Sequence, residues 1–109
     1  MLIRFKEGVY LKYIDEEFLG LSKIVFEEFQ KDGTVPVVTS ACDGSHMKGS
    51  LHFEGRGWDW RVWGLRDPGQ TADRIRVRAQ ALSQKYDVIF GDAAHLDHIH
   101  TEFDIKKGG

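Results

Sequence analysis

The sequence predicts an α+β fold: a small, mainly antiparallel sheet with two helices packed against it, in a single domain spanning residues 1–109. Two observations predict this class. Apolar residues recur at helical spacing in two segments, and short β-branched or alternating runs lie before, between and after those segments. With 109 residues, of which 41% are hydrophobic, the chain is long enough to bury one modest core.

The first half of the chain is expected to contain one helix. Residues 9–14 alternate loosely, which is typical of a short strand or a lead-in. Apolar residues at helical spacing predict a helix from Glu16 to Gln30, with Asp15 as its N-cap. A β-branched run predicts a strand over residues 35–40. Residues 41–56 are rich in glycine and read as a long irregular loop, a kind of segment that is usually functional.

The second half is expected to contain the second helix between strands. Large apolar and charged residues alternate from Trp58 to Trp63, which predicts a strand. Helical spacing predicts a helix over residues 71–85, after a turn. Two further strands are expected at residues 88–90 and 98–105. The solvated side of the second helix is expected to carry Arg74, Arg76 and Arg78.

Composition excludes several classes of protein. The formal net charge of −2 gives no basic field for phosphates, so we expect no nucleic-acid partner. Cys42 is the only cysteine, which excludes an intrachain disulfide and a thiolate zinc cluster. The N-terminal segment is too charged for a signal peptide, and no window has the length of a membrane span. We therefore expect synthesis in the cytoplasm and no membrane partner, and we expect a monomer.

Histidines gather in two glycine- and acid-rich segments, residues 46–59 and 92–104. The five are His46, His52, His95, His98 and His100. The His-Ile-His sequence at 98–100 places both imidazoles on one face of a strand, where they can serve as two ligands or as one ligand and one substrate contact. Taken alone, this motif is more simply explained as an exposed polar strand face. Asp97 adds a carboxylate just before this strand.

A second group of polar residues lies in the sequence SLHFEGRGWD, residues 50–59. Gly55 and Gly57 allow the backbone to curl, so that His52 and Asp59 can converge on one point. Alone, each is more simply explained as a polar loop residue or a turn cap. Two histidines, one aspartate and a further acidic residue together give three ligands with an open fourth position, which is the layout of a catalytic zinc site.

These residues match the pattern SxHxxGxxxD followed by HxH. The chain thereby resembles the zinc D-Ala-D-Ala carboxypeptidases, dipeptidases and L-alanoyl-D-glutamate endopeptidases of bacteria and phages, and also the hedgehog signalling domain, which carries SLHYEGRAVD. The similarity runs from about residue 37 to residue 103. It implies a fold of the hedgehog and D,D-peptidase type. It also implies that His52, Asp59 and His100 bind Zn²⁺ and that Asp97 is the catalytic acidic residue.

The resemblance implies a zinc metallopeptidase, a hydrolase that cleaves peptidoglycan stem peptides or other peptides containing D-amino acids through a metal-activated water. A chain of this size fits a phage lysis or virion enzyme that acts on the cell wall after release. The residues expected to bind substrate are His98, His46, Arg56 and Ser50, although a solvent-exposed loop histidine explains His46 equally well. Asp92 and His95 are alternatives to Asp97 as the base, although both read more simply as surface polar residues.

Two departures from the family pattern bear on substrate binding. The peptidases usually carry an arginine in a TSGYR-like stretch, whereas this chain has Thr-Ser-Ala-Cys-Asp over residues 39–43. Arg56 is the candidate substitute. Gly57 also replaces the alanine that is common before the aspartate. The alternative function is a catalytically inactive zinc-binding interaction domain of the hedgehog type; Asp97, a base beside the metal, favours the peptidase.

Overall fold

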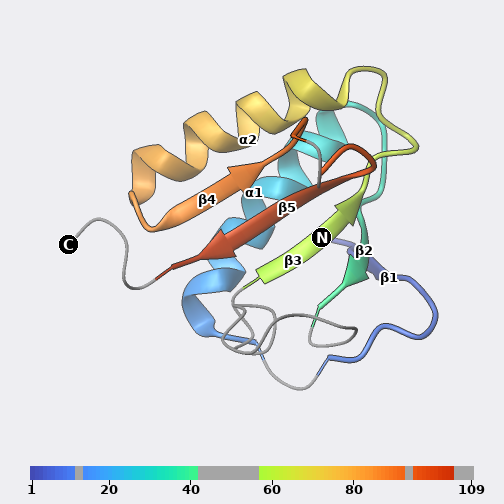
Figure 1. Ribbon diagram of the computed structural model, residues 1–109, viewed down its shortest axis with the longest axis horizontal. Coiled ribbons are helices and arrows are strands. Elements are labelled where there is room, and N and C mark those ends of the chain that lie inside the picture. The colour runs from blue at the N-terminus through green and yellow to red at the C-terminus, as the bar shows by residue number, and fades with distance from the viewer. Residues whose placement is uncertain (12–13, 42–56, 93–94, 105–109) are drawn as a thin grey trace.

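The computed structural model describes residues 1–11, 14–41, 57–92 and 95–104. In these residues it is an α+β domain of two helices and a five-stranded sheet, as the fold class predicts (Figure 1). The elements are β1 (Arg4–Phe5), α1 (Glu16–Lys31), β2 (Val37–Ser40), β3 (Gly57–Arg61), α2 (Pro68–Leu82), β4 (Tyr86–Ile89) and β5 (His98–Phe103).

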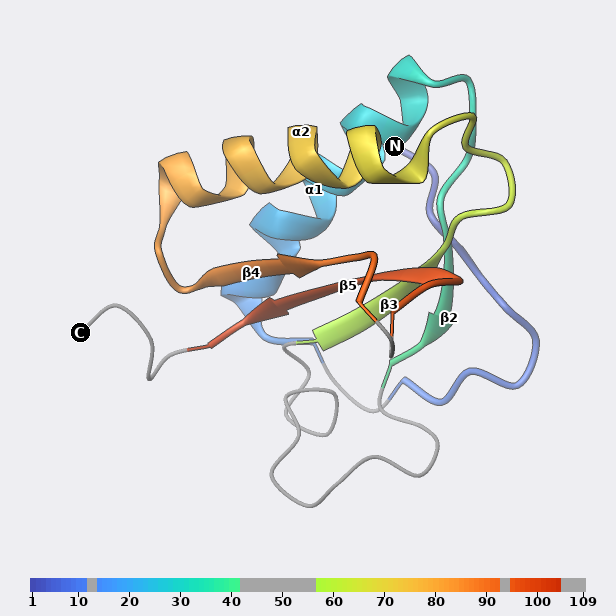
Figure 2. The same cartoon turned by 45° about the horizontal axis from the view of Figure 1, so that its top comes forward.

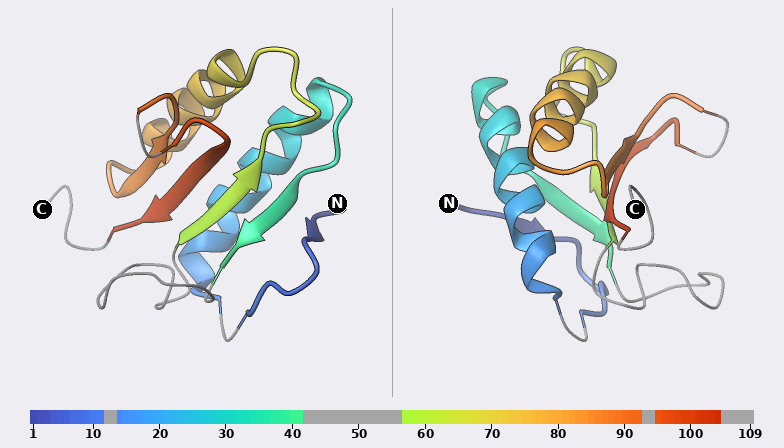
Figure 3. Two further views of the ribbon diagram at one scale, coloured as in Figure 1. Left: turned by 45° about the vertical axis from the view of Figure 1, so that its right-hand side comes forward. Right: turned by 90° about the vertical axis from the view of Figure 1, so that its left-hand side faces the viewer.

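The sheet is mixed, with the strand order β1-β2-β3-β5-β4. The pairs β2–β3, β3–β5 and β4–β5 are antiparallel, whereas β1 runs parallel to β2. The parallel pair arises because α1 connects these two strands, and a helical crossover returns the chain in the same direction. Both helices cover the same face of the sheet (Figures 2 and 3).

The first strand lies earlier than the sequence indicates. The alternating segment at residues 9–14 contains no strand at 9–11 or 14, and residues 12–13 lie outside the described part. Instead, Arg4 donates its backbone N–H to Pro36 at 2.9 Å, and Lys6 donates to Val38 at 2.9 Å. A two-residue edge strand held by such bonds is too short to show a periodicity.

Helix α1 follows the prediction closely. Asp15 caps it, since its Oδ1 accepts a hydrogen bond from the Glu17 N–H at 2.9 Å. Its apolar face is fully buried against the sheet and α2, and comprises Phe18, Leu21, Val25 and Phe29. Phe18 meets Trp58 of β3 edge-to-face, with ring centroids 5.1 Å apart. The core therefore lies between the helices and one face of the sheet.

Helix α2 begins three residues before the predicted start. Asp67 is the N-cap and accepts from the Gln70 N–H at 3.1 Å, with Pro68 at the first helical position. The segment that reads as a turn is thus the helix start. The helix also ends earlier than predicted, at Leu82, which is 70% exposed. Neither helix in the described part of the chain has both the length and the hydrophobicity that a bilayer crossing requires.

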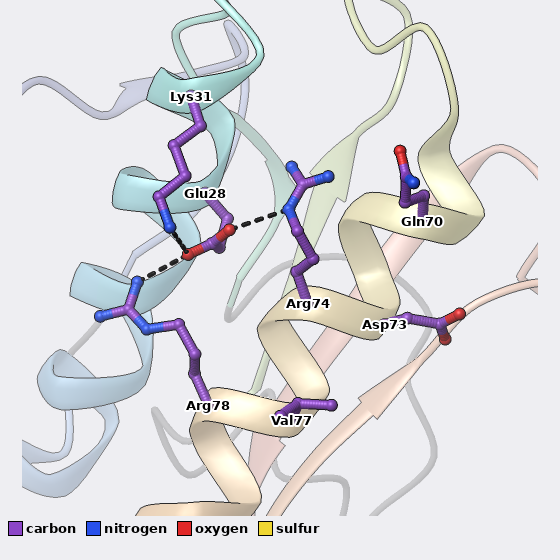
Figure 4. A pocket seen from close by; sticks show the side chains of 7 residues that line it. All are labelled: Glu28, Lys31, Gln70, Asp73, Arg74, Val77 and Arg78. Carbon is purple, nitrogen blue, oxygen red and sulfur yellow. Dashed lines mark hydrogen bonds and ion pairs between the residues drawn. The ribbon is translucent and has the colours of Figure 1, made fainter.

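A buried carboxylate joins the two helices on their outer side. Glu28 of α1 is fully buried, and its carboxylate accepts hydrogen bonds from Lys31, Arg74 and Arg78 at 2.8–2.9 Å (Figure 4). Burial opposes ionisation, but these bonds outweigh it and lower the pKa of Glu28 to about 2. The prediction that Arg74, Arg76 and Arg78 form the solvated side of the helix is therefore wrong, since Arg76 also donates from Nε to the carbonyl oxygen of Val88 at 3.0 Å.

Candidate functional site

Strands β3 and β5 sort their side chains onto two faces. Their buried residues, which face the helices, are Trp58, Trp60, Ile99, Thr101 and Phe103. The alternate residues project from the opposite face of the sheet, away from the helices, and are Asp59, Arg61, His98, His100 and Glu102. This alternation confirms the predicted faces of the last strand. We call this side of the sheet the open face.

The register of the two strands brings two of the predicted ligands together. Asp59 lies directly opposite His100, and Arg61 lies opposite His98. The Nδ1 atom of His100 is 2.8 Å from Oδ1 of Asp59, and the two side chains are only 12% and 14% exposed. Residues 41 positions apart in sequence thus meet on neighbouring strands.

His100 is held by a carboxylate on each side of its ring. Its Nδ1 contacts Asp59, and its Nε2 lies 2.7 Å from Oε1 of Glu102. Burial acts to lower the pKa of His100, but the two carboxylates outweigh it and raise the pKa to about 9. In this arrangement both ring nitrogens donate, because an ionised carboxylate only accepts.

Glu102 belongs to the candidate site, although sequence reasoning gave it no role there. Its side chain shares the open face with that of His100, and its carboxylate contacts the far nitrogen of that ring. A carboxylate on the far nitrogen fixes the orientation and tautomer of a metal-binding histidine, as it does in many zinc proteins. The signal was present in the sequence, since residues 100 and 102 share one face of a strand.

His98 links Asp97 to the same cluster. Its Nδ1 lies 2.7 Å from Oδ1 of Asp97, and its Nε2 lies 3.7 Å from Oδ1 of Asp59. Asp97 itself is 87% exposed, and the hydrogen bond from His98 lowers the pKa of its carboxyl. The imidazole of His98 therefore stands between the predicted catalytic carboxylate and the predicted ligand.

His95 also belongs to this cluster, contrary to its simpler reading as a surface residue. Its ring centroid lies 5.3 Å from that of His98 and 5.5 Å from that of His100. Its Nδ1 lies 2.6 Å from Oδ1 of Asp92, so this pair repeats the carboxylate–imidazole arrangement of Asp97 and His98. The turn between β4 and β5 carries His95 to the open face, which spacing alone does not reveal.

Several predicted site residues lie outside the described part of the chain. These are the third predicted zinc ligand, His52, and three predicted substrate contacts, Ser50, His46 and Arg56. Within the described residues, the structure brings together Asp59, His98, His100 and Asp97 where the end of β3 lies beside the start of β5.

A second group of possible metal ligands lies further along the same face. Asp87, Glu102 and Asp104 present carboxylate oxygens that all lie within 4.8 Å of one another. Such a group could hold a metal ion through oxygen alone, the donor type preferred by Mg²⁺ and Ca²⁺ rather than by zinc. Exposed acidic groups commonly occur without an ion, so this cluster is the weaker basis for a metal site.

Comparisons with known proteins add no assignment to this geometry. No protein-family model, curated protein or solved structure matches the chain.

Proposed function

We propose that this protein is a zinc-dependent peptidase that hydrolyses short peptides of bacterial peptidoglycan, of the D,D-carboxypeptidase, dipeptidase or L-alanoyl-D-glutamate endopeptidase type. The observation that carries the proposal is the Asp59–His100–Glu102 arrangement. One imidazole is held between two carboxylates, with one of its nitrogens against the carboxylate that the SxHxxGxxxD pattern marks as a ligand.

The donor set suits zinc. Zinc in proteins takes imidazole nitrogen and carboxylate oxygen at about 2.0–2.2 Å, and two ligand atoms on one tetrahedral ion lie about 3.4 Å apart. Nδ1 of His100 and Oδ1 of Asp59 are 2.8 Å apart, so a small movement would let both bind one ion. Glu102 would keep the remaining proton of His100 on Nε2 and leave Nδ1 free to ligate. His52 is proposed as the third ligand.

A zinc ion held here would lower the pKa of a bound water to about 7 and polarise a scissile carbonyl. The chain's own residues would move the protons. The contacts favour His98 as the group nearest the reacting atoms, with Asp97 orienting its ring and stabilising the imidazolium. His95 with Asp92 forms a competing pair of the same kind.

The experiment is a turnover assay on purified peptidoglycan and on defined D-Ala-D-Ala and L-Ala-D-Glu peptides, with products identified by mass spectrometry. The zinc-loaded protein should release product, and a chelator should stop it. Cleavage of none of these substrates by protein shown to contain zinc would contradict the proposal and favour an inactive, hedgehog-like zinc-binding domain.

Two variants separate the candidate proton carriers. If the Asp97–His98 pair acts, Asp97→Asn should lower kcat by about 10²-fold or more, whereas His95→Gln should change it only a few-fold. The reverse ranking would assign the role to His95 and Asp92. Both variants should retain bound zinc, because neither changes a proposed ligand.

A further inference from the structure

A pocket lies on the open face beside the Asp59–His100 pair. It has a volume of about 340 Å³ and is lined by Lys6, Thr39, Arg61, Trp63, Asp97 and His98. The pocket is continuous with the candidate site, because His98 belongs to both and Arg61 lies opposite it in the strand register. Thr39 also contacts the backbone of Asp59, donating from its hydroxyl to the carbonyl oxygen at 3.4 Å.

The guanidinium of Arg61 has a fixed position in this pocket. Its guanidinium carbon lies 4.0 Å from the centre of the Trp63 ring, which fixes the plane of the group by a cation–π contact. Its Nε atom is buried and has no hydrogen-bond partner among the described residues. A buried donor without a partner is costly, and a ligand that accepts its hydrogen bond would remove that cost.

The charge of the pocket favours an anion. Two of its six lining residues, Lys6 and Arg61, are cationic. The acidic residue among the six, Asp97, is already engaged by His98 at 2.7 Å. A planar guanidinium presents paired N–H groups that match a carboxylate, which accepts two parallel hydrogen bonds.

We propose that Arg61, assisted by Lys6, binds the free C-terminal carboxylate of the substrate peptide. This inference rests on the proposed function and narrows it to cleavage next to the last residue of a chain, the carboxypeptidase or dipeptidase type. Asp59 and Arg61 project from the same face two strand positions apart, about 7 Å along the backbone. Consecutive Cα atoms of a peptide lie about 3.8 Å apart. The last residue of a substrate peptide can therefore link a scissile carbonyl near Asp59 to a terminal carboxylate that is bound by the Arg61 guanidinium.

A binding measurement on metal-free protein tests the inference without requiring catalysis. Trp63 is 77% exposed and lines the pocket, so its fluorescence should report occupancy, with Trp63→Phe as the check on the signal. N-acetyl-D-alanyl-D-alanine should bind EDTA-treated protein about 10- to 100-fold more tightly than the same peptide with a C-terminal amide. Equal affinity for acid and amide would overturn the proposal.

Variants assign the preference to Arg61. Arg61→Gln should abolish the preference for the acid, Arg61→Lys should keep part of it, and Lys6→Gln should weaken it by a smaller factor. Arg66→Gln is the matched control, because Arg66 is an exposed arginine outside this pocket. An unchanged urea midpoint would show that Arg61→Gln is folded. If the folded variant still preferred the acid, the assignment to Arg61 would be contradicted. If the variant does not fold, the Lys6→Gln variant and the comparison of acid with amide in the natural chain decide.

Kinetics distinguish this inference from the proposed function. In zinc-loaded protein, Arg61→Gln should raise KM for the acid substrate about 10- to 100-fold with little change in kcat, and should leave the amide unaffected. If hydrolysis is absent but metal-free protein prefers the acid, the carboxylate site stands and the peptidase proposal fails. If hydrolysis occurs with equal KM for acid and amide, the peptidase stands and the carboxylate site fails.

Discussion

Within the described part of the chain, the largely buried carboxylates Glu28 and Asp59 have partners that differ in kind. Glu28, between the helices, accepts hydrogen bonds from a lysine and two arginines. Asp59, on the open face, has the imidazoles of His100 and His98 at 2.8 and 3.7 Å. Arginine and lysine side chains stay charged at neutral pH, whereas an imidazole can lose its proton and become a metal ligand.

This difference suits the Glu28 cluster to stabilising the fold and the Asp59–His100 pair to the proposed metal binding. The cations around Glu28 are permanent, so the cluster is complete in itself and fastens α1 to α2. The proton between His100 and Asp59 is exchangeable, and under the proposed function a divalent ion would take its place after a small movement of the two side chains. Altering the first cluster should therefore change stability alone, and altering the second should change metal binding and activity.

The largest expected effect is on the open face. His100→Ala removes a proposed ligand, so the zinc content should fall from one ion per chain to near zero. Activity should fall by more than about 10²-fold, which exceeds the loss expected when a residue that only orients a ligand is removed. Metal analysis and the turnover assay measure both. Glu28→Gln is the matched control and should keep its zinc and its activity. If His100→Ala kept its zinc, the proposed difference between the two carboxylate clusters would be contradicted.

The next effect is on stability. Glu28→Ala leaves the cations of Lys31, Arg74 and Arg78 without their shared anion and opens a gap between the helices. It should lower the free energy of unfolding by about 3 kcal/mol, measured by urea denaturation at pH 7. Asp73→Ala, on an exposed position of α2, should cost under about 0.5 kcal/mol. Similar losses of unfolding free energy in the two variants would show that the Glu28 cluster stabilises the fold no more than an exposed ion pair does.

The Glu28 cluster also makes stability depend on pH. The pKa of this carboxyl is lowered from 4.5 to about 2 in the folded protein. Its contribution is therefore complete above about pH 4.5 and is lost as the pH falls from 4.5 towards 2, by about 2–3 kcal/mol in total. Urea unfolding at pH 6 and pH 3 should show this decrease in the natural chain and much less of it in Glu28→Gln. Parallel curves for both proteins would assign the acid sensitivity to other carboxylates.

The smallest of these effects concerns Glu102. Glu102→Gln should weaken zinc binding by about 10- to 100-fold while leaving the fold intact, because it loosens the orientation of His100 without removing a ligand. Competition with a chromogenic chelator measures the affinity. Asp104→Asn tests the acidic cluster at the end of β5 and should leave the zinc affinity unchanged. Equal losses for the two variants would indicate that the ion lies in the acidic cluster.

Much of the fold could be predicted because it depends on local signals. The apolar spacing and the cap at Asp15 specify α1, and strict alternation specifies both faces of β5. The start of α2 was missed because Asp67-Pro68-Gly69 suits a turn and a capped helix equally well. Strand β1 was missed because two residues show no period.

The site could be predicted only in part, for the same reason. The sequence patterns mark Asp59 and His100, but the roles of neighbouring residues depend on contacts across the fold. His95 reaches the cluster through a turn, and Arg74 finds its partner Glu28 46 positions away on another helix. No spacing rule joins such residues, so only the packed chain reveals them.

The most direct test is a crystal structure of the zinc-loaded protein with anomalous data at the zinc edge. We predict one peak about 2.0–2.2 Å from Nδ1 of His100 and from an oxygen of Asp59, with Glu102 still on Nε2 of the same ring. A peak among Asp87, Glu102 and Asp104 instead, or no peak on the open face, would contradict the account.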